Sequence, residues 1–214
     1  MRRWAVALSL LLAGVAEAGD ITAVVRDQKN GPLADAVVTA VPRGGTPAPP
    51  ARPARETIDQ IDKEFVPFVK AVFVGSPVFF PNKDNIRHHV YSFSVAKTFE
   101  LPLYTGTPAK PVVFDKPGIV TIGCNIHDWM IGYIYIATTP YFGTTARAGR
   151  VKLDDLPPGT YTVRVWHPHM EGAEQATARS VNVEAGSTDV SVQLPLKEEF
   201  RPRRAPVPGQ RGYR

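Results

Sequence analysis

The stretch that decides the fold runs from Lys116 to Gly132 and reads KPGIVTIGCNIHDWMIG. Its first part is rich in β-branched residues, which is typical of a strand. Cys124 follows at the end of this strand, and His127 and Met130 come after it at intervals of three residues. Residues 131–136 then form an apolar run that predicts a returning strand. The stretch therefore predicts a strand, a tight loop that carries cysteine, histidine and methionine, and a second strand.

The rest of the chain also has the sequence pattern of β-strands joined by turns. Helical periodicity is weak, and short β-rich runs are separated by Gly, Pro and Asn-Gly turns, which is typical of β-sandwiches. The expected strands are residues 21–26, 36–41, 65–74, 88–94, 112–114, 119–123, 131–136, 149–153, 160–166, 181–183 and 190–194. The sequence therefore predicts an all-β protein.

Both ends of the chain, and one internal segment, lack the pattern of a folded core. Residues 1–18 read as a secretory signal peptide, because Arg2 and Arg3 precede an uncharged apolar run that ends in a small-x-small cleavage pattern. This run is too short for a membrane span, so we expect a periplasmic protein without one. Residues 46–55 are a Pro-rich linker, and residues 197–214 are expected to be a disordered basic tail.

The positive net charge of the chain comes from its end. Residues 201–214 contain five arginines and no acidic residue. Without those five charges and the net single positive charge of residues 1–18, the formal charge falls from +5 to −1 for residues 19–200. A nucleic-acid partner therefore has no support, because it would need basic residues on the folded surface.

Cys124 is the only cysteine, and its neighbours suggest a metal. In an exported protein, an unpaired cysteine is either buried and inert or occupied by a metal ion. A thiolate, two imidazoles and a weak thioether form a type 1 (blue) copper site, and Cys124, His127 and Met130 supply three of these donors. The second imidazole must come from another strand. His88-His89 opens such a strand, and alternation allows only one of the two to face the site.

Other chemistry fits this loop less well. Zinc would need Asp128 in place of the methionine, which is a poor zinc ligand. A Cys124–His127 nucleophile pair would lack a third orienting group and an oxyanion hole. A separate cluster of His167, His169 and Met170 is either a second copper or loading site or, as we expect, a solvated surface loop.

Residues 57–138 resemble the cupredoxins. The second half of the resemblance is the 116–132 stretch, whose ligand loop is spaced as in amicyanin. The first half is carried by Phe65-Val66-Pro67, Gly75, Val78, Phe80, Asn82, Asp84, His88 and Val90. The resemblance implies a Greek-key β-sandwich with one type 1 copper ion held by His88, Cys124, His127 and Met130. His89 stands where many cupredoxins carry asparagine, and it is the alternative first ligand.

The flanking segments have a different pattern. Residues 31–38 and 149–163 resemble transthyretin-like (carboxypeptidase regulatory-type) β-sandwich domains. We therefore expect residues 19–45 and 143–196 to form one small prealbumin/Ig-like sandwich, with a cupredoxin domain at residues 56–142 inserted into it. The alternative is a single larger cupredoxin with extended ends.

These expectations favour an electron carrier. The resemblance implies periplasmic redox partners such as a c-type cytochrome or a dehydrogenase. Copper storage or delivery, which the His167 cluster would favour, and a recognition module without catalysis are the alternatives. We do not expect an enzyme, because a type 1 site is coordinatively closed.

Overall fold

The computed structural model describes residues 17–45 and 54–197, so nearly all of the predicted signal peptide, linker and tail lies outside the described residues. Strands make up almost all regular structure, and one short 3₁₀ helix, η1 (Glu174–Thr177), accompanies them. The predicted all-β fold is confirmed. In the described part of the chain, no helix is long and apolar enough to span a membrane.

The strands are β1 (Gly19–Asp27), β2 (Val37–Pro42), β3 (Glu56–Thr57), β4 (Asp59–Ile61), β5 (Glu64–Val66), β6 (Val69–Phe73), β7 (Ser76–Phe79), β8 (His88–Ser94), β9 (Lys97–Tyr104), β10 (Val112–Phe114), β11 (Gly118–Cys124), β12 (His127–Ala137), β13 (Phe142–Thr144), β14 (Arg150–Leu156), β15 (Gly159–Trp166), β16 (Arg179–Val183) and β17 (Gly186–Leu194).

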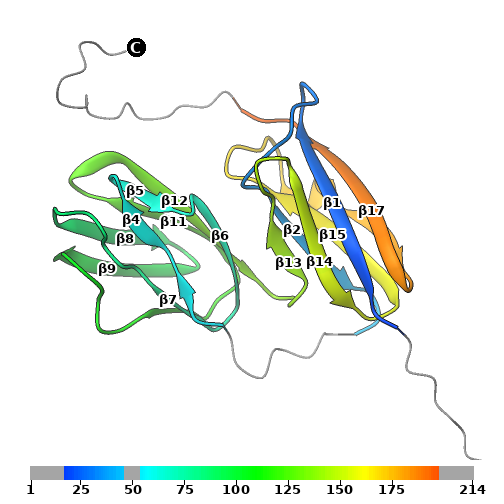
Figure 1. Cartoon of the computed structure of the whole chain (residues 1–214), viewed down its shortest axis with the longest axis horizontal. Helices are drawn as coiled ribbons and strands as arrows, with labels where there is room; N and C mark the ends of the chain where they lie inside the picture. The colour runs from blue at the N-terminus through cyan, green and yellow to red at the C-terminus, as the bar shows by residue number, and fades with distance from the viewer. Residues whose placement is uncertain (1–16, 46–53, 198–214) are drawn as a thin grey trace, which may run out of the picture.

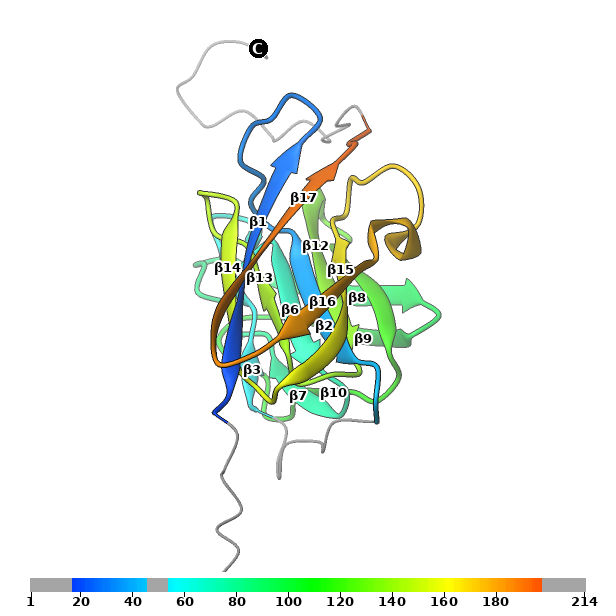
Figure 2. The same ribbon diagram turned by 90° about the vertical axis from the view of Figure 1, so that its right-hand side faces the viewer.

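The strands lie in two groups, seen side by side in Figure 1 and along a perpendicular direction in Figure 2. One group contains β1, β2 and β13–β17, and we call it the outer sandwich because it holds both ends of the described chain. The other contains β3–β12, and we call it the site sandwich. Whether each group is a separately folding domain stays a prediction.

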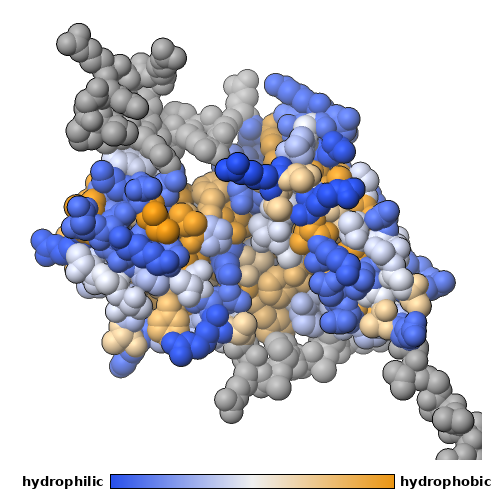
Figure 3. All heavy atoms as spheres, viewed as in Figure 1, coloured by the Kyte–Doolittle hydropathy of each residue, from blue (hydrophilic) through white to orange (hydrophobic). Residues whose placement is uncertain are grey.

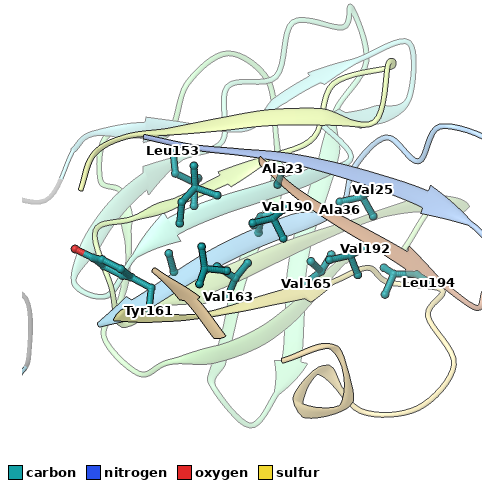
Figure 4. Packing of buried hydrophobic residues seen from close by; sticks show 14 of the residues in the cluster. Ala23, Val25, Ala36, Leu153, Tyr161, Val163, Val165, Val190, Val192 and Leu194 are labelled. Carbon is teal, nitrogen blue, oxygen red and sulfur yellow. The ribbon is translucent and has the colours of Figure 1, made fainter. Parts of the chain in front are cut away.

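The outer sandwich has two sheets, with strand orders β14-β1-β17 and β13-β2-β15-β16. β1 pairs with β17 in parallel and with β14 in antiparallel, so the first and last strands of the described chain are neighbours. Alternate residues of β1 are buried, as a strand with one face on a core requires. The core between the sheets is rich in valine and includes Val25, Leu153 and Val163 (Figure 4).

The site sandwich is built on a five-stranded sheet of order β6-β12-β11-β8-β9. The three-stranded sheet β10-β7-β3 and the β4-β5 hairpin complete it. In β12 the even-numbered residues from Met130 to Ile136 are buried, so this face points into the core. Both Cys124 and Met130 belong to that core cluster.

One strand prediction was wrong, and several strands were not predicted, of which β9 is the longest. Residues 65–74 were expected as one strand, but the structure has two, β5 and β6, which end and begin on either side of Pro67. Proline has no N–H to donate, so the ladder is interrupted there. Strand β9 was missed because Lys97, Glu100 and Pro102 hide its apolar residues, and its place at the sheet edge explains why such residues are tolerated.

The two sandwiches meet through an aromatic cluster. The odd-numbered face of β12 carries Tyr133 and Tyr135, whose rings lie 6.1 and 5.7 Å from the ring of Trp166 in β15. The hydroxyl of Tyr135 also donates a hydrogen bond to Glu174 Oε1 at 2.7 Å. Buried Val37, Val69 and Ala71 complete this contact. In Figure 3, hydrophobic residues fill part of the zone between two more hydrophilic surfaces.

The outer sandwich offers a direct test of core packing. Leu153→Ala should lower the free energy of unfolding by about 2–5 kcal/mol, because Leu153 is buried among valines and the mutation leaves a cavity. Leu103→Ala is the matched control, since Leu103 is 42% exposed at an edge strand, and should change stability by about 0.5 kcal/mol. Urea unfolding of both variants measures the difference, and equal effects would contradict the described core.

Candidate metal centre

The pairing of β11 with β12 positions the cysteine and one histidine. The two strands are antiparallel, and the last pair of the ladder is Cys124 with His127. Only Asn125 and Ile126 lie between them, so the chain reverses in a tight turn. Cys124 is 4% exposed, and its Sγ lies 3.6 Å from His127 Nδ1. The thiol and an imidazole nitrogen therefore face each other at the end of the hairpin.

The third donor comes from β8, which lies next to β11 in the same sheet. His88, the first residue of β8, is fully buried, and its ring centroid is 4.9 Å from that of His127. Single donor atoms of His88, Cys124 and His127 all lie within 4.8 Å of one another. Among the described residues, no other group of three or more His, Cys, Asp or Glu side chains converges in this way.

The ring of His88 is oriented by a carboxylate. Its Nε2 lies 2.7 Å from Asp84 Oδ2, while its Nδ1 is buried and has no hydrogen-bond partner in the described part of the chain. A buried nitrogen without a partner is unfavourable by about 1–3 kcal/mol. A metal ion between His88, Cys124 and His127 would bind the unpartnered Nδ1 of His88 through its lone pair. The residues present therefore fit a copper ion of the predicted type.

The fourth predicted ligand, Met130, lies on the inward face of β12 and is 1% exposed. It belongs to the same core cluster as Cys124. This placement is compatible with a thioether beside the thiol, and the role of Met130 as a ligand stays a prediction.

His89 points away from this cluster. Its ring lies 5.5 Å from the ring of Tyr91, and it is not part of the converging donor group. Its Nε2 is 2.9 Å from Glu100 Oε1, close enough for an ion pair, but the two groups are not aligned as a hydrogen bond. The Glu100 side chain is 68% exposed, so this contact contributes little to stability. Of the two adjacent histidines, the structure brings His88 to Cys124 and His127.

The electrostatics favour the form of His127 that a metal needs. Burial, followed by the charges of His88 and Lys63, lowers the pKa of His127. Burial would raise the pKa of Asp84, but hydrogen bonds from the Lys63 N–H, the His88 ring and the Asp62 N–H outweigh it and lower that pKa. The lowered pKa values keep the His127 imidazole neutral and the Asp84 carboxylate ionised. A neutral imidazole is the form that metal binding requires.

One edge of the site approaches the surface. His127 is partly exposed, and its ring lies 5.3 Å from that of Trp129. Ile126, in the turn before His127, is 49% exposed. The loop histidine thus lies beside a small apolar surface formed by Ile126 and Trp129.

The other histidine cluster is of a different kind. The rings of His167 and His169 are 5.6 Å apart, but His167 Nδ1 accepts the backbone N–H of His169 at 3.2 Å. His167 is buried, and burial, with a smaller effect of His169, lowers its pKa to about 4. Met170 is buried in the core of the outer sandwich. One nitrogen of the pair is therefore already engaged within the chain. The expectation of a solvated surface loop is wrong for His167 and Met170, because both are buried against the outer sandwich.

Sequence reasoning missed the contacts that support the loop before His88. Asn82 donates from Nδ2 to the carbonyls of Ile86 and Tyr104, both at 2.8 Å, and its Oδ1 accepts the N–H of Asp84 at 3.0 Å. Asn82 and Asp84 were noted only for their resemblance to cupredoxins. An acidic residue four positions before the ligand was the available signal, but its partners come from a hairpin more than twenty residues away.

Comparisons with known proteins give partial matches. A family model described as polysaccharide lyase family 4, domain II, matches residues 131–191, which is less than half of the chain. No curated protein matches. The transthyretin-like character of the outer sandwich stays a prediction, since the matching model describes a different domain.

Similar solved structures include copper proteins and cupredoxins. A Cu-containing nitrite reductase from Thermus scotoductus SA-01 has a TM-score of 0.37 and 26% identity, and the match covers 44% of this chain but only 24% of the reductase. A purple cupredoxin from Nitrosopumilus maritimus has a TM-score of 0.34 and 22% identity over 39% of this chain and 99% of its own. A reduced Cu(I) amicyanin mutant has a TM-score of 0.35 and 16% identity, covering 47% and 98%. Each TM-score is low, so the function is inferred from this chain's own side chains.

The two adjacent histidines can be separated by mutation. His88→Ala should abolish tight copper binding, because it removes one of three converging donors. His89→Ala should retain it, since His89 faces Tyr91 instead. Copper titration of both variants decides the assignment, and loss of binding in His89→Ala alone would reverse it.

Proposed function

We propose that the protein is an exported, periplasmic type 1 copper protein that carries single electrons between redox partners. His88, Cys124, His127 and Met130 would hold the ion. The observation that carries the proposal is the buried convergence of a thiol and two imidazoles, with the lone pair of His88 Nδ1 left unused by the described residues. A copper ion bound there would supply a one-electron Cu(II)/Cu(I) couple.

The protein's part in electron transfer is to hold the donors still. Cys124 and His127 close one hairpin, and His88 begins the neighbouring strand of the same sheet. Donors fixed on strands move little when the charge of the ion changes, which keeps the reorganisation between oxidation states small. The partly exposed edge of His127, next to Ile126, supports an apolar docking point for a partner.

The same geometry favours copper over zinc. Asp128, the carboxylate that could complete a zinc set, is exposed, whereas Met130 lies in the core with Cys124. A structural zinc site would need a fourth N, S or carboxylate donor, and a buried thioether is a poor one. Three donors with a thioether suit a softer ion.

We further propose that the protein is not an enzyme and that its partners are periplasmic redox proteins, such as a c-type cytochrome or a dehydrogenase. Four protein ligands would leave no open coordination position for a substrate. Copper storage or delivery is the less favoured function, because its distinguishing cluster has His167 Nδ1 engaged by the backbone.

The absorption and EPR spectra of the mature protein with one equivalent of Cu(II) test the proposal. We expect an intense band near ~600 nm and a narrow copper hyperfine splitting, both from a thiolate–copper bond. Cys124→Ser should lose both, because it removes the thiolate while nearly preserving volume. A colourless wild-type protein with ordinary copper spectra would exclude the electron-carrier function.

Met130 is tested separately. Met130→Leu nearly preserves the buried volume, so folding should be affected by less than about 1.5 kcal/mol. The intense band should persist, and the reduction potential should rise, because the axial thioether donates weakly to Cu(II) and tunes the potential. Voltammetry of the two proteins measures this, and an unchanged potential would remove Met130 from the ligand set.

A further inference from the structure

Asp84 connects the candidate metal centre to the β4–β5 hairpin, which is more than twenty residues away along the sequence. It lies in the loop between β7 and β8, four residues before His88, and its side chain is 13% exposed. Its Oδ1 accepts the N–H of Asp62 at 2.7 Å, and its Oδ2 accepts the N–H of Lys63 at 2.9 Å. The same Oδ2 lies 2.7 Å from His88 Nε2. One carboxylate therefore makes three contacts, two to backbone and one to the imidazole.

The two backbone donors come from an unusual turn. Asp62 and Lys63 connect β4 to β5, and both have positive φ, at 52° and 59°. Two successive residues in the left-handed region are the mark of a tight type I′ hairpin, and here both N–H groups reach one carboxylate. Lys83 Nζ also pairs with Asp59 Oδ2 at 2.6 Å, and Gln60 exchanges backbone hydrogen bonds with Pro81 and Lys83, so further contacts join the hairpin to the loop. Asp84 is thus held from the side opposite His88.

These contacts set the orientation of His88. A carboxylate at 2.7 Å makes Nε2 the nitrogen that carries the proton. The lone pair is then on Nδ1, which is buried, without a partner among the described residues, and belongs to the ring that packs on His127. A carboxylate behind a ligand imidazole also raises the basicity of that ligand.

We infer that Asp84 is a positioning residue of the copper centre, whose carboxylate fixes the ring and tautomer of His88 and favours oxidised over reduced copper. The inference rests on the proposed function. The negative charge of Asp84, held close to the His88 ring, favours Cu(II) over Cu(I). The competing role, a cap of the 62–63 turn alone, would affect folding and leave the metal centre unchanged.

Asp84→Asn is the first variant. It keeps the shape of the side chain but removes the charge and turns one acceptor into a donor. The matched control is Asp59→Asn, which breaks the ion pair with Lys83 on the same hairpin and has no contact with a ligand in the described structure. Asp84→Glu keeps the charge and lengthens the side chain by one methylene.

The copper-free protein gives the first readout. Nitrogen-15 NMR of the histidine rings should show the proton of His88 on Nε2 in wild type and in Asp59→Asn. In Asp84→Asn the two tautomers should mix. The second readout is copper affinity: Asp84→Asn should bind Cu(II) roughly 10- to 100-fold more weakly, with a smaller loss for Cu(I), so the reduction potential rises while the intense absorption band persists.

The outcomes are distinguishable. If Asp84→Asn has the tautomer, affinities and potential of Asp59→Asn and loses only thermal stability, Asp84 is a turn cap and the inference is overturned. If wild type shows no intense band, the proposed function is wrong, and the copper-free tautomer still tests whether Asp84 positions His88. Should Asp84→Asn not fold, Asp84→Glu decides, because its longer side chain displaces the carboxylate from His88: mixed His88 tautomers or a shifted reduction potential support the inference, and the wild-type tautomer with an unchanged potential overturns it.

Discussion

The antiparallel pairing of β11 with β12 is the constraint on which the rest of the molecule depends. Its ladder ends on Cys124 and His127, so the register that satisfies the backbone also sets a thiol against an imidazole. A slip of one residue would turn every side chain of a strand to the other face. Such a slip would move Met130 out of the core and Tyr133 into it. The register shifts between Gly123 and Cys124, so the regular part of the ladder sets the face of Met130 and the end of the hairpin sets the Cys124–His127 pair.

Burial of His88 adds a second constraint. Placing a fully buried imidazole beside another with one nitrogen unpaired is unfavourable unless something uses that lone pair. The structure satisfies the opposite nitrogen with a carboxylate that is itself held by two backbone N–H groups. The hydrogen bond thus lies at Nε2, which leaves Nδ1 available for a ligand bond. Purely structural histidines have no reason to be arranged in this way, so the arrangement indicates function.

Much of the fold and of the candidate site could be predicted from the sequence, because the deciding patterns are local. The C-x-x-H-x-x-M spacing and the β-branched run before it are local, and local pattern fixed the strand–loop–strand reading of residues 116–136. His88 could be placed by its strand position, but alternation alone left His89 equally possible, and only the tertiary structure shows which one meets Cys124. The role of Asp84 was beyond sequence reasoning because its backbone partners, Asp62 and Lys63, adopt positive φ without glycine. Strand β9 was hidden by Pro102, which an edge position tolerates.

The outer sandwich restrains the candidate metal centre by packing against β12. The inner face of this strand holds Met130 in the core with Cys124, while its outer face presses Tyr133 and Tyr135 against Trp166. A strand packed on both faces can neither slide nor twist without breaking one of the two contacts. The hydrogen bond from Tyr135 to Glu174 anchors the outer face further. Because His127 and Met130 are carried by that same strand, the aromatic contact between the sandwiches restrains two of the four proposed ligands. Rigidity at the candidate site is then partly a property of the second sandwich.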